Sequence, residues 1–143
     1  MDQASKPVDL ARALRIMHGA LAAGVVLVGA VILLLVRVRG QAIWGGPTLG
    51  TALAVASALL LVVAALVLRP RIPDRNLQDS PETYWAMPRS RGAAIILWAV
   101  TEGASLIGWV GYLLTGATLP MVAGLLATVM LIWYRPSGLE GAA

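Results

Sequence analysis

Four long apolar runs constrain the fold of this chain more than any other feature of its sequence. A helix that crosses the hydrocarbon core of a bilayer needs about 20 mainly apolar residues. Such runs lie at about 14–36, 48–68, 93–114 and 119–134, the last of them shorter than the others. Apolar residues surround the axis of each run, as expected where lipid and neighbouring helices are both apolar. The sequence therefore predicts an all-α fold, a four-helix transmembrane bundle that forms a single membrane domain over residues 1–143.

Charge content and the absence of cysteine exclude several other classes of protein. Charged residues make up 13% of the chain, about half their usual share in soluble domains. No cysteine is present, so a disulfide scaffold and a thiolate metal site are excluded. The basic residues fall between the apolar runs rather than on one polar face, which argues against nucleic-acid binding. We expect no nucleic-acid partner, no metal and no cofactor.

The distribution of arginine and lysine predicts how the spans are oriented. Only Arg37 and Arg39 lie on one side of the expected membrane. The other nine basic residues lie on the opposite side: Lys6, Arg12, Arg15, Arg69, Arg71, Arg75, Arg89, Arg91 and Arg135. Short basic segments stay in the cytoplasm, so both termini are expected to be cytoplasmic. The first run is longer than the roughly 7–15 apolar residues of a cleavable signal peptide, so we expect it to be retained as a span.

The segments between the apolar runs predict one tight turn and one sizeable loop. Residues 115–118 contain a glycine and precede Pro120, so the last two spans are expected to form an antiparallel hairpin. The cytoplasmic loop 69–91 carries six residues that we single out as partner or lipid contacts: Arg71, Arg75, Tyr84, Trp85, Arg89 and Arg91. Arginine and aromatic residues are favoured at contact centres, and basic residues attract anionic headgroups. The same residues are equally consistent with charge that sets topology and with interfacial aromatics.

Glu102 is the one acidic residue inside an apolar run. It lies ten residues after Gly92, about 15 Å deep in a core of about 30 Å, where an acid is costly and its neutral form is favoured. Its helix face carries polar and aromatic side chains: Trp98, Ser105, Trp109 and Tyr112. Small residues beside that face would let a neighbouring backbone approach closely: Gly103, Ala104, Gly108 and Gly111.

Two interpretations of Glu102 stay open. In the first, the neutral carboxyl bonds to a carbonyl or hydroxyl group of another helix and fixes packing. In the second, it takes up and releases a proton or a cation. A proton relay needs several titratable groups, and His18, near the start of the first span, is the second such group in the apolar runs. A Glu102→Gln substitution that leaves assembly and activity intact would exclude the proton interpretation.

His18 also has two interpretations. Neutral imidazole is a common axial ligand of a haem or chlorin metal, yet the chain has no second histidine to complete such a pair. The alternative is an interfacial side chain that caps a helix or bonds near Arg12 and Arg15. We favour this alternative.

The stretch from Tyr84 to Gly116 resembles a family of small, uncharacterised bacterial membrane proteins with four spans. The third span of that family carries an Ala-x-x-Glu-Gly-x-x-Leu core followed by Leu-Leu-Thr-Gly. The matching residues here are Ala99, Glu102, Gly103, Leu106, Leu113, Leu114, Thr115 and Gly116. Residues 14–21 are similar to the start of the same family. The resemblance implies a multi-pass protein of the bacterial inner membrane and implies no particular activity.

Residues 102–114 are also similar to part of the proteolipid that forms the rotor ring of ATP synthases. In that proteolipid, too, small residues and an apolar run follow a membrane-embedded glutamate. The chain departs from it because it has no run of alternating glycines and because its acid lies in the third span rather than the last.

Small size and the lack of a recognisable active site predict a protein without enzymatic activity. We expect a subunit or an accessory or assembly factor of a larger membrane complex, in contact with lipids and with other membrane subunits or itself. The alternative is a proton- or cation-handling membrane protein that uses Glu102.

Overall fold

The computed structural model describes residues 9–39, 45–76 and 78–140, and these residues form helices and turns without a strand. The expected all-α fold is thus confirmed. In chain order the elements are α1 (Leu10–Arg39), α2 (Pro47–Val63), the π-helical η1 (Ala64–Leu68), the 3-10 turn η2 (Arg69–Arg71), α3 (Pro81–Ala86), α4 (Pro88–Thr115), α5 (Thr118–Trp133) and α6 (Pro136–Leu139).

Three helical stretches are long and apolar enough to cross a membrane. They are Leu10–Arg39, Pro47–Arg71 and Pro88–Thr115, and each contains one of the first three predicted runs. The helices are a few residues longer than the apolar runs, because the residues that flank each run are helical as well. The fourth run forms α5, an apolar helix of 16 residues, which is about 24 Å long.

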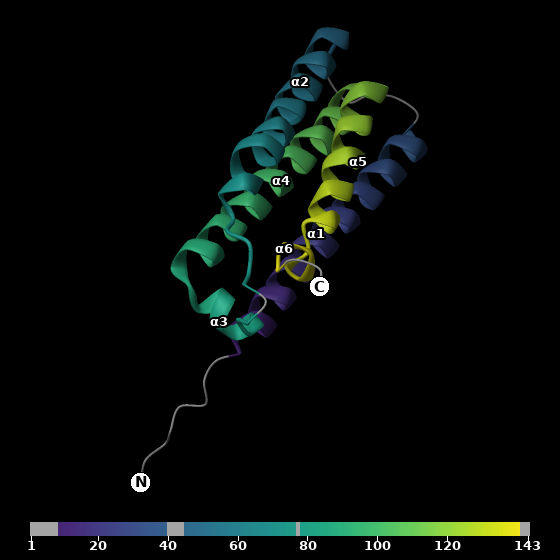
Figure 1. Cartoon of the computed structure of the whole chain (residues 1–143). Coiled ribbons are helices and arrows are strands. Elements are labelled where there is room, and N and C mark those ends of the chain that lie inside the picture. Colours follow the sequence, from purple (N-terminus) through teal and green to yellow (C-terminus); the bar gives the residue numbers. More distant parts are fainter. Residues whose placement is uncertain (1–8, 40–44, 77, 141–143) are drawn as a thin grey trace.

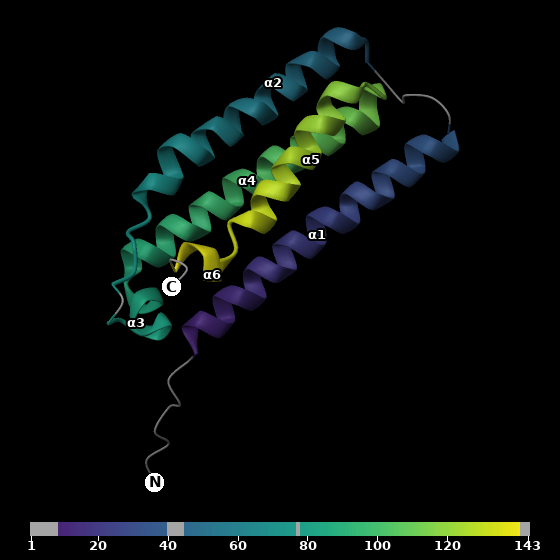
Figure 2. The same ribbon diagram turned by 45° about the vertical axis from the view of Figure 1, so that its right-hand side comes forward.

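The α4–α5 pair forms the middle of the bundle, and α1 and α2 pack on its opposite flanks (Figure 1, Figure 2). Helices α1 and α2 follow each other in the chain, yet the central pair separates them. The start of α1, helix α3 and the end of α5 with α6 all lie at one end of the bundle, which we call the α3 end (Figure 2). The turn between α4 and α5 lies at the other end.

Glycines set the close contact between the two central helices. A Cβ atom on Gly108 of α4 would overlap the backbone of Gly124 on α5, and one on Gly124 would lie 2.9 Å from the Trp109 amide nitrogen. The predicted hairpin is confirmed, because α5 begins two residues after α4 and packs back along it. Gly116 caps the end of α4 with a φ of 64° in the left-handed region. The predicted close approach of a backbone beside Gly108 is confirmed as well.

The segment 69–91, predicted as a loop between two spans, contains the turn η2, helix α3 and the first turn of α4. The Ser80 hydroxyl caps α3 by accepting a hydrogen bond from the Thr83 amide at 3.2 Å. Pro81 and Pro88 occupy the first positions of α3 and α4, where a missing N–H costs nothing. These local signals start α3 and α4 within the segment, and α3 packs against α1 and α4.

Candidate functional site

Glu102 lies in the centre of α4, as the fifteenth of its 28 residues, about 20 Å from either helix end. Its side chain is partly buried. One turn earlier, Trp98 lies against the His18 ring of α1, and seven residues later Trp109 packs on Gly29 of α1. Glu102 therefore lies on the face of α4 that meets α1. Exposed Ile95 lies on the same side of the helix, so the acid is at the edge of that contact.

A closed hydrogen-bond cluster joins α4 to α5 next to Glu102. Thr128 on α5 donates to the Gly124 carbonyl at 2.8 Å. Its hydroxyl oxygen lies 2.7 Å from the Ser105 hydroxyl and accepts from Trp109 Nε1 at 3.2 Å. The polar groups of Ser105 and Trp109 thus form their hydrogen bonds with α5 and not with Glu102. The sequence singled out Ser105 and Trp109 but missed Thr128, whose role depends on how α5 is rotated against α4.

The Glu102 carboxyl makes no hydrogen bond or ion pair with any residue within 9–39, 45–76 or 78–140. Tyr112 is also partly buried, and its hydroxyl makes no hydrogen bond within the same ranges. In contrast, the buried hydroxyls of Ser57 and Thr101 donate to backbone carbonyls at 2.8 Å. Among the described residues, no hydrogen bond or ion pair therefore supports a packing role for Glu102.

His18 and Trp98 together cap the C-terminal end of α5. His18 is buried, and its Nε2 lies 2.9 Å from the Leu131 carbonyl oxygen. Because a carbonyl only accepts, Nε2 carries the proton. Trp98 Nε1 donates to the Tyr134 carbonyl at 2.7 Å. The last carbonyls of a helix lack partners within it, so these two contacts favour the capping interpretation of His18 over that of a metal ligand.

A second polar cluster at the α3 end is centred on Glu140, a residue that the sequence analysis did not single out. Glu140 is 7% exposed, and its Oε1 accepts from Trp85 Nε1 at 2.8 Å and pairs with Arg15 Nη2 at 3.3 Å. The Trp85 ring in turn lies 6.3 Å from the Trp98 ring. No local signal marks Glu140, because its partners come from segments 55 and 125 residues away.

The aromatic pair of α3 is not the surface contact that the sequence suggested. Tyr84 and Trp85 are both fully buried, because α3 folds back against α1 and α4. The Tyr84 hydroxyl donates to the Pro73 carbonyl at 2.7 Å, and burial raises the pKa of this phenol. The hydroxyl of Ser90, at the start of α4, is buried and has no hydrogen-bond partner among the residues that the structure describes.

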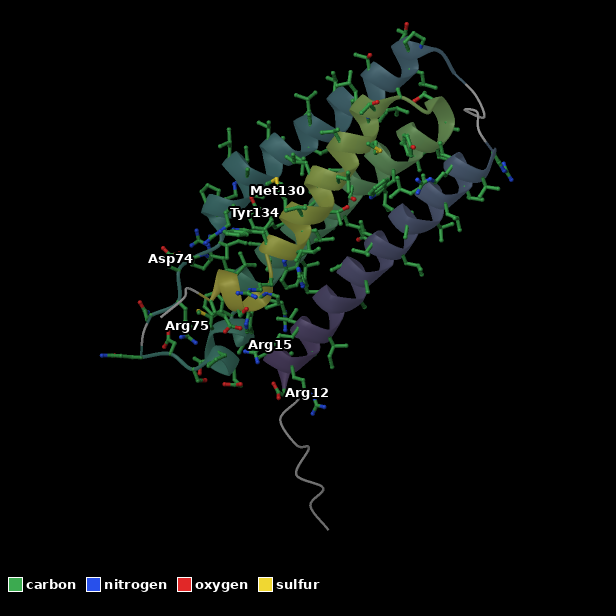
Figure 3. The ribbon with its side chains drawn as sticks, turned by 90° about the vertical axis from the view of Figure 1, so that its right-hand side faces the viewer. Arg12, Arg15, Asp74, Arg75, Met130 and Tyr134 are labelled. Carbon is green, nitrogen blue, oxygen red and sulfur yellow. The ribbon has the colours of Figure 1, made fainter. Side chains whose placement is uncertain are left out.

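The arginines of the same segment remain accessible in part. Arg71 and Arg89 are exposed, whereas Arg75 and Arg91 are partly buried. Figure 3 shows Arg75 at the same end of the bundle as Arg12 and Arg15. None of the four forms an ion pair with another described residue, so their role as lipid or partner contacts stays a prediction.

These features define a helical bundle of the kind found in multi-pass membrane proteins. Within the described ranges, no three histidine, aspartate or glutamate side chains come together as a group that could hold a metal ion. No protein-family model, curated protein or solved structure matches this chain. The two resemblances set out from the sequence therefore stay predictions.

Proposed function

We propose that this chain is a small, non-enzymatic subunit or accessory factor of a larger membrane complex, and that Glu102 is where a partner helix binds. The observation that carries the proposal is the carboxyl at the centre of α4, partly buried and without a partner among the described residues. Neighbouring polar groups such as Ser105 and Thr128 are satisfied inside the bundle. This contrast points to a partner outside the chain.

The cost of an isolated acid in hydrocarbon supports this proposal. Acidic residues in membrane helices pair with one another, with carbonyls or with water. Interhelical hydrogen bonds of polar side chains are one of the forces that hold membrane helices together. A helix with a hydroxyl, amide or carbonyl group at mid-membrane, from another subunit or from a second copy, would satisfy Glu102 at the edge of the α1–α4 contact.

We further propose four spans in a bacterial inner membrane, with both termini in the cytoplasm. Eight of the ten described arginines lie in or next to the start of α1, η2, the start of α4 and the turn between α5 and α6, whereas Arg37 and Arg39 lie at the opposite end of α1. This distribution matches the rule that basic segments stay inside. Exposed apolar side chains such as Leu27, Leu34 and Leu66 suit contact with lipid. Helix α5 is shorter than a bilayer core, which local thinning would accommodate.

A proton- or cation-handling role for Glu102 is the second candidate. His18 contacts Trp98, one helical turn before Glu102, so the two titratable side chains lie along the same α1–α4 contact. This placement gives the second candidate its specific support.

Purification of the tagged chain at native expression in a mild detergent distinguishes these candidates. Stable co-purification with other membrane proteins, or a homo-oligomer held together through Glu102, supports the first candidate. A homo-oligomer whose carboxyl is labelled by a hydrophobic carbodiimide in a pH-dependent manner supports the second. An isolated monomer without such labelling contradicts both.

A further inference from the structure

A groove of about 590 Å³ opens at the α3 end, between the end of α5, α6 and Arg69 of η2. Its volume lies in the range of small-molecule sites, about 300–1,000 Å³. Val129, Ile132 and Trp133 of α5 form its apolar wall, and Arg69 and Arg135 form its charged part. These two arginines are not among the residues that the sequence singled out as lipid contacts.

The charge of the groove favours an anion. Its lining contains two arginines and no acidic residue. Neither Arg69 nor Arg135 forms an ion pair with any residue that the structure describes. Guanidinium groups bind phosphate oxygens in a bidentate manner and are less strongly hydrated than ammonium groups. Two of them facing one opening suit a phosphate group.

The apolar wall continues away from the arginines along α5. Exposed apolar side chains follow one another at helical spacing up the helix: Val122, Leu125, Leu126, Val129, Ile132 and Trp133. This stripe runs from the groove along the exposed side of α5 towards the start of that helix. It therefore offers an acyl chain a path that starts at the charged end of the groove.

The backbone just before Arg69 departs from α-helical geometry. Residues Ala64–Leu68 are wound as a π-helix, whose turn holds one residue more than an α-turn and which is frequent at functional sites. Arg69 follows the π-helix directly and lines the groove together with Arg135, whereas Arg71 is exposed and does not line it.

We propose that this groove binds an anionic phospholipid of the bilayer, with its phosphate group between Arg69 and Arg135 and an acyl chain along α5. Basic pockets on the cytoplasmic side of membrane helices bind such headgroups. The inference rests on the proposed membrane placement but not on the partner of Glu102.

The test uses the purified full chain in a mild detergent. It is titrated with dioctanoyl phosphatidylglycerol, dioctanoyl phosphatidylcholine and inorganic phosphate, and affinity is read from the rise in the thermal unfolding midpoint. We expect stabilisation by phosphatidylglycerol alone. Arg69→Gln and Arg135→Gln should each weaken its binding about five-fold, and the double variant about twenty-five-fold. The matched control Arg71→Gln, two residues from Arg69, should bind as the wild type does.

Each other result overturns the proposal. Equal stabilisation by phosphatidylcholine would show that the arginines do not select an anionic headgroup. Equal stabilisation by inorganic phosphate would show that the groove binds an anion and does not recognise the acyl chain. An equal loss in Arg71→Gln would indicate diffuse surface charge. If an arginine variant does not fold, Val129→Trp decides, because it fills the groove and keeps both charges. Unchanged binding in that variant contradicts the proposal, whereas loss supports it.

The result is independent of the partner proposal. Lipid binding is measured on the chain alone, so its failure leaves the role of Glu102 open. A chain that purifies as a monomer would leave the lipid titration equally valid.

Discussion

The indole N–H of Trp85 lies 2.8 Å from a carboxyl oxygen of Glu140 and donates a hydrogen bond to it, although the two residues are 55 positions apart. Both side chains are buried. This hydrogen bond joins α3 to the residue that follows α6. Arg15 of α1 pairs with the same carboxyl group at 3.3 Å. Three separate segments are thus held at the α3 end of the bundle through one acid.

Substitution of Glu140 should separate the two interactions of this carboxyl. Glu140→Leu leaves the buried Trp85 N–H without an acceptor and should lower the free energy of unfolding by about 1–3 kcal/mol. Glu140→Gln keeps an acceptor oxygen and loses only the pair with Arg15, whose side chain is 51% exposed, so its effect should stay below about 1 kcal/mol. Thermal unfolding in detergent, followed by circular dichroism, measures both. Equal losses in the two variants would contradict this assignment.

Two glycines of α4 provide a matched pair for the contact between the central helices. Gly108→Ala would force a methyl group into the backbone of α5, and overpacking of this kind costs about 1–3 kcal/mol. The methyl group of Gly103→Ala would lie more than 4 Å from the other described residues, apart from the backbone of its own helical turn, and should stabilise the helix by about 0.5–1 kcal/mol. Unfolding midpoints should therefore move in opposite directions. A shift of the same sign in both variants would argue against the α4–α5 contact.

Thr128 should be the most sensitive hydroxyl of the bundle. Thr128→Val keeps the shape of the side chain but removes its hydrogen bonds to Gly124, Ser105 and Trp109. The free energy of unfolding should fall by about 1–2 kcal/mol. Ser57→Ala removes a single bond to the Ala104 carbonyl and should cost about 0.5 kcal/mol. The same unfolding assay compares them. A larger effect of Ser57→Ala would show that the Thr128 cluster is not formed.

Stability should fall at alkaline pH in part through Tyr84. Burial raises the pKa of its phenol above the ordinary value of 10.0. Below that value both the folded and the unfolded chain hold the proton. As the pH rises further, the unfolded chain releases its proton first, so stability is lost. Tyr84→Phe should make this decline shallower in unfolding measured from pH 9 to 11, and an unchanged slope would contradict the burial of the phenol.

The sequence was sufficient for the helices because their apolar runs are long. The runs at 14–36 and 93–114 lie within α1 and α4, and Gly116 marks the turn after α4 because a left-handed residue ends a helix there. Gly108 indicated a close helix contact. These features are local, so a single sequence contains them.

How the helices pack against one another, and how the α3 end folds, could not be predicted from the sequence. A helix that is apolar all round has no stripe to show which face packs inward, so the separation of α1 from α2 and the position of Thr128 stayed open. Tyr84, Trp85 and Glu140 are far apart in sequence, and their burial depends on the complete fold. Side chains that looked suited to a surface became part of the core.

The mass of the assembly formed by Glu102 variants in mild detergent tests the central claim most directly. Wild-type chain and Glu102→Gln should run in the same large assembly, because an amide keeps hydrogen-bonding groups at that position. Glu102→Leu should release the chain from its partner while the chain alone stays folded by circular dichroism. If Glu102→Leu remains in an assembly of unchanged mass, Glu102 is not the contact with a partner helix.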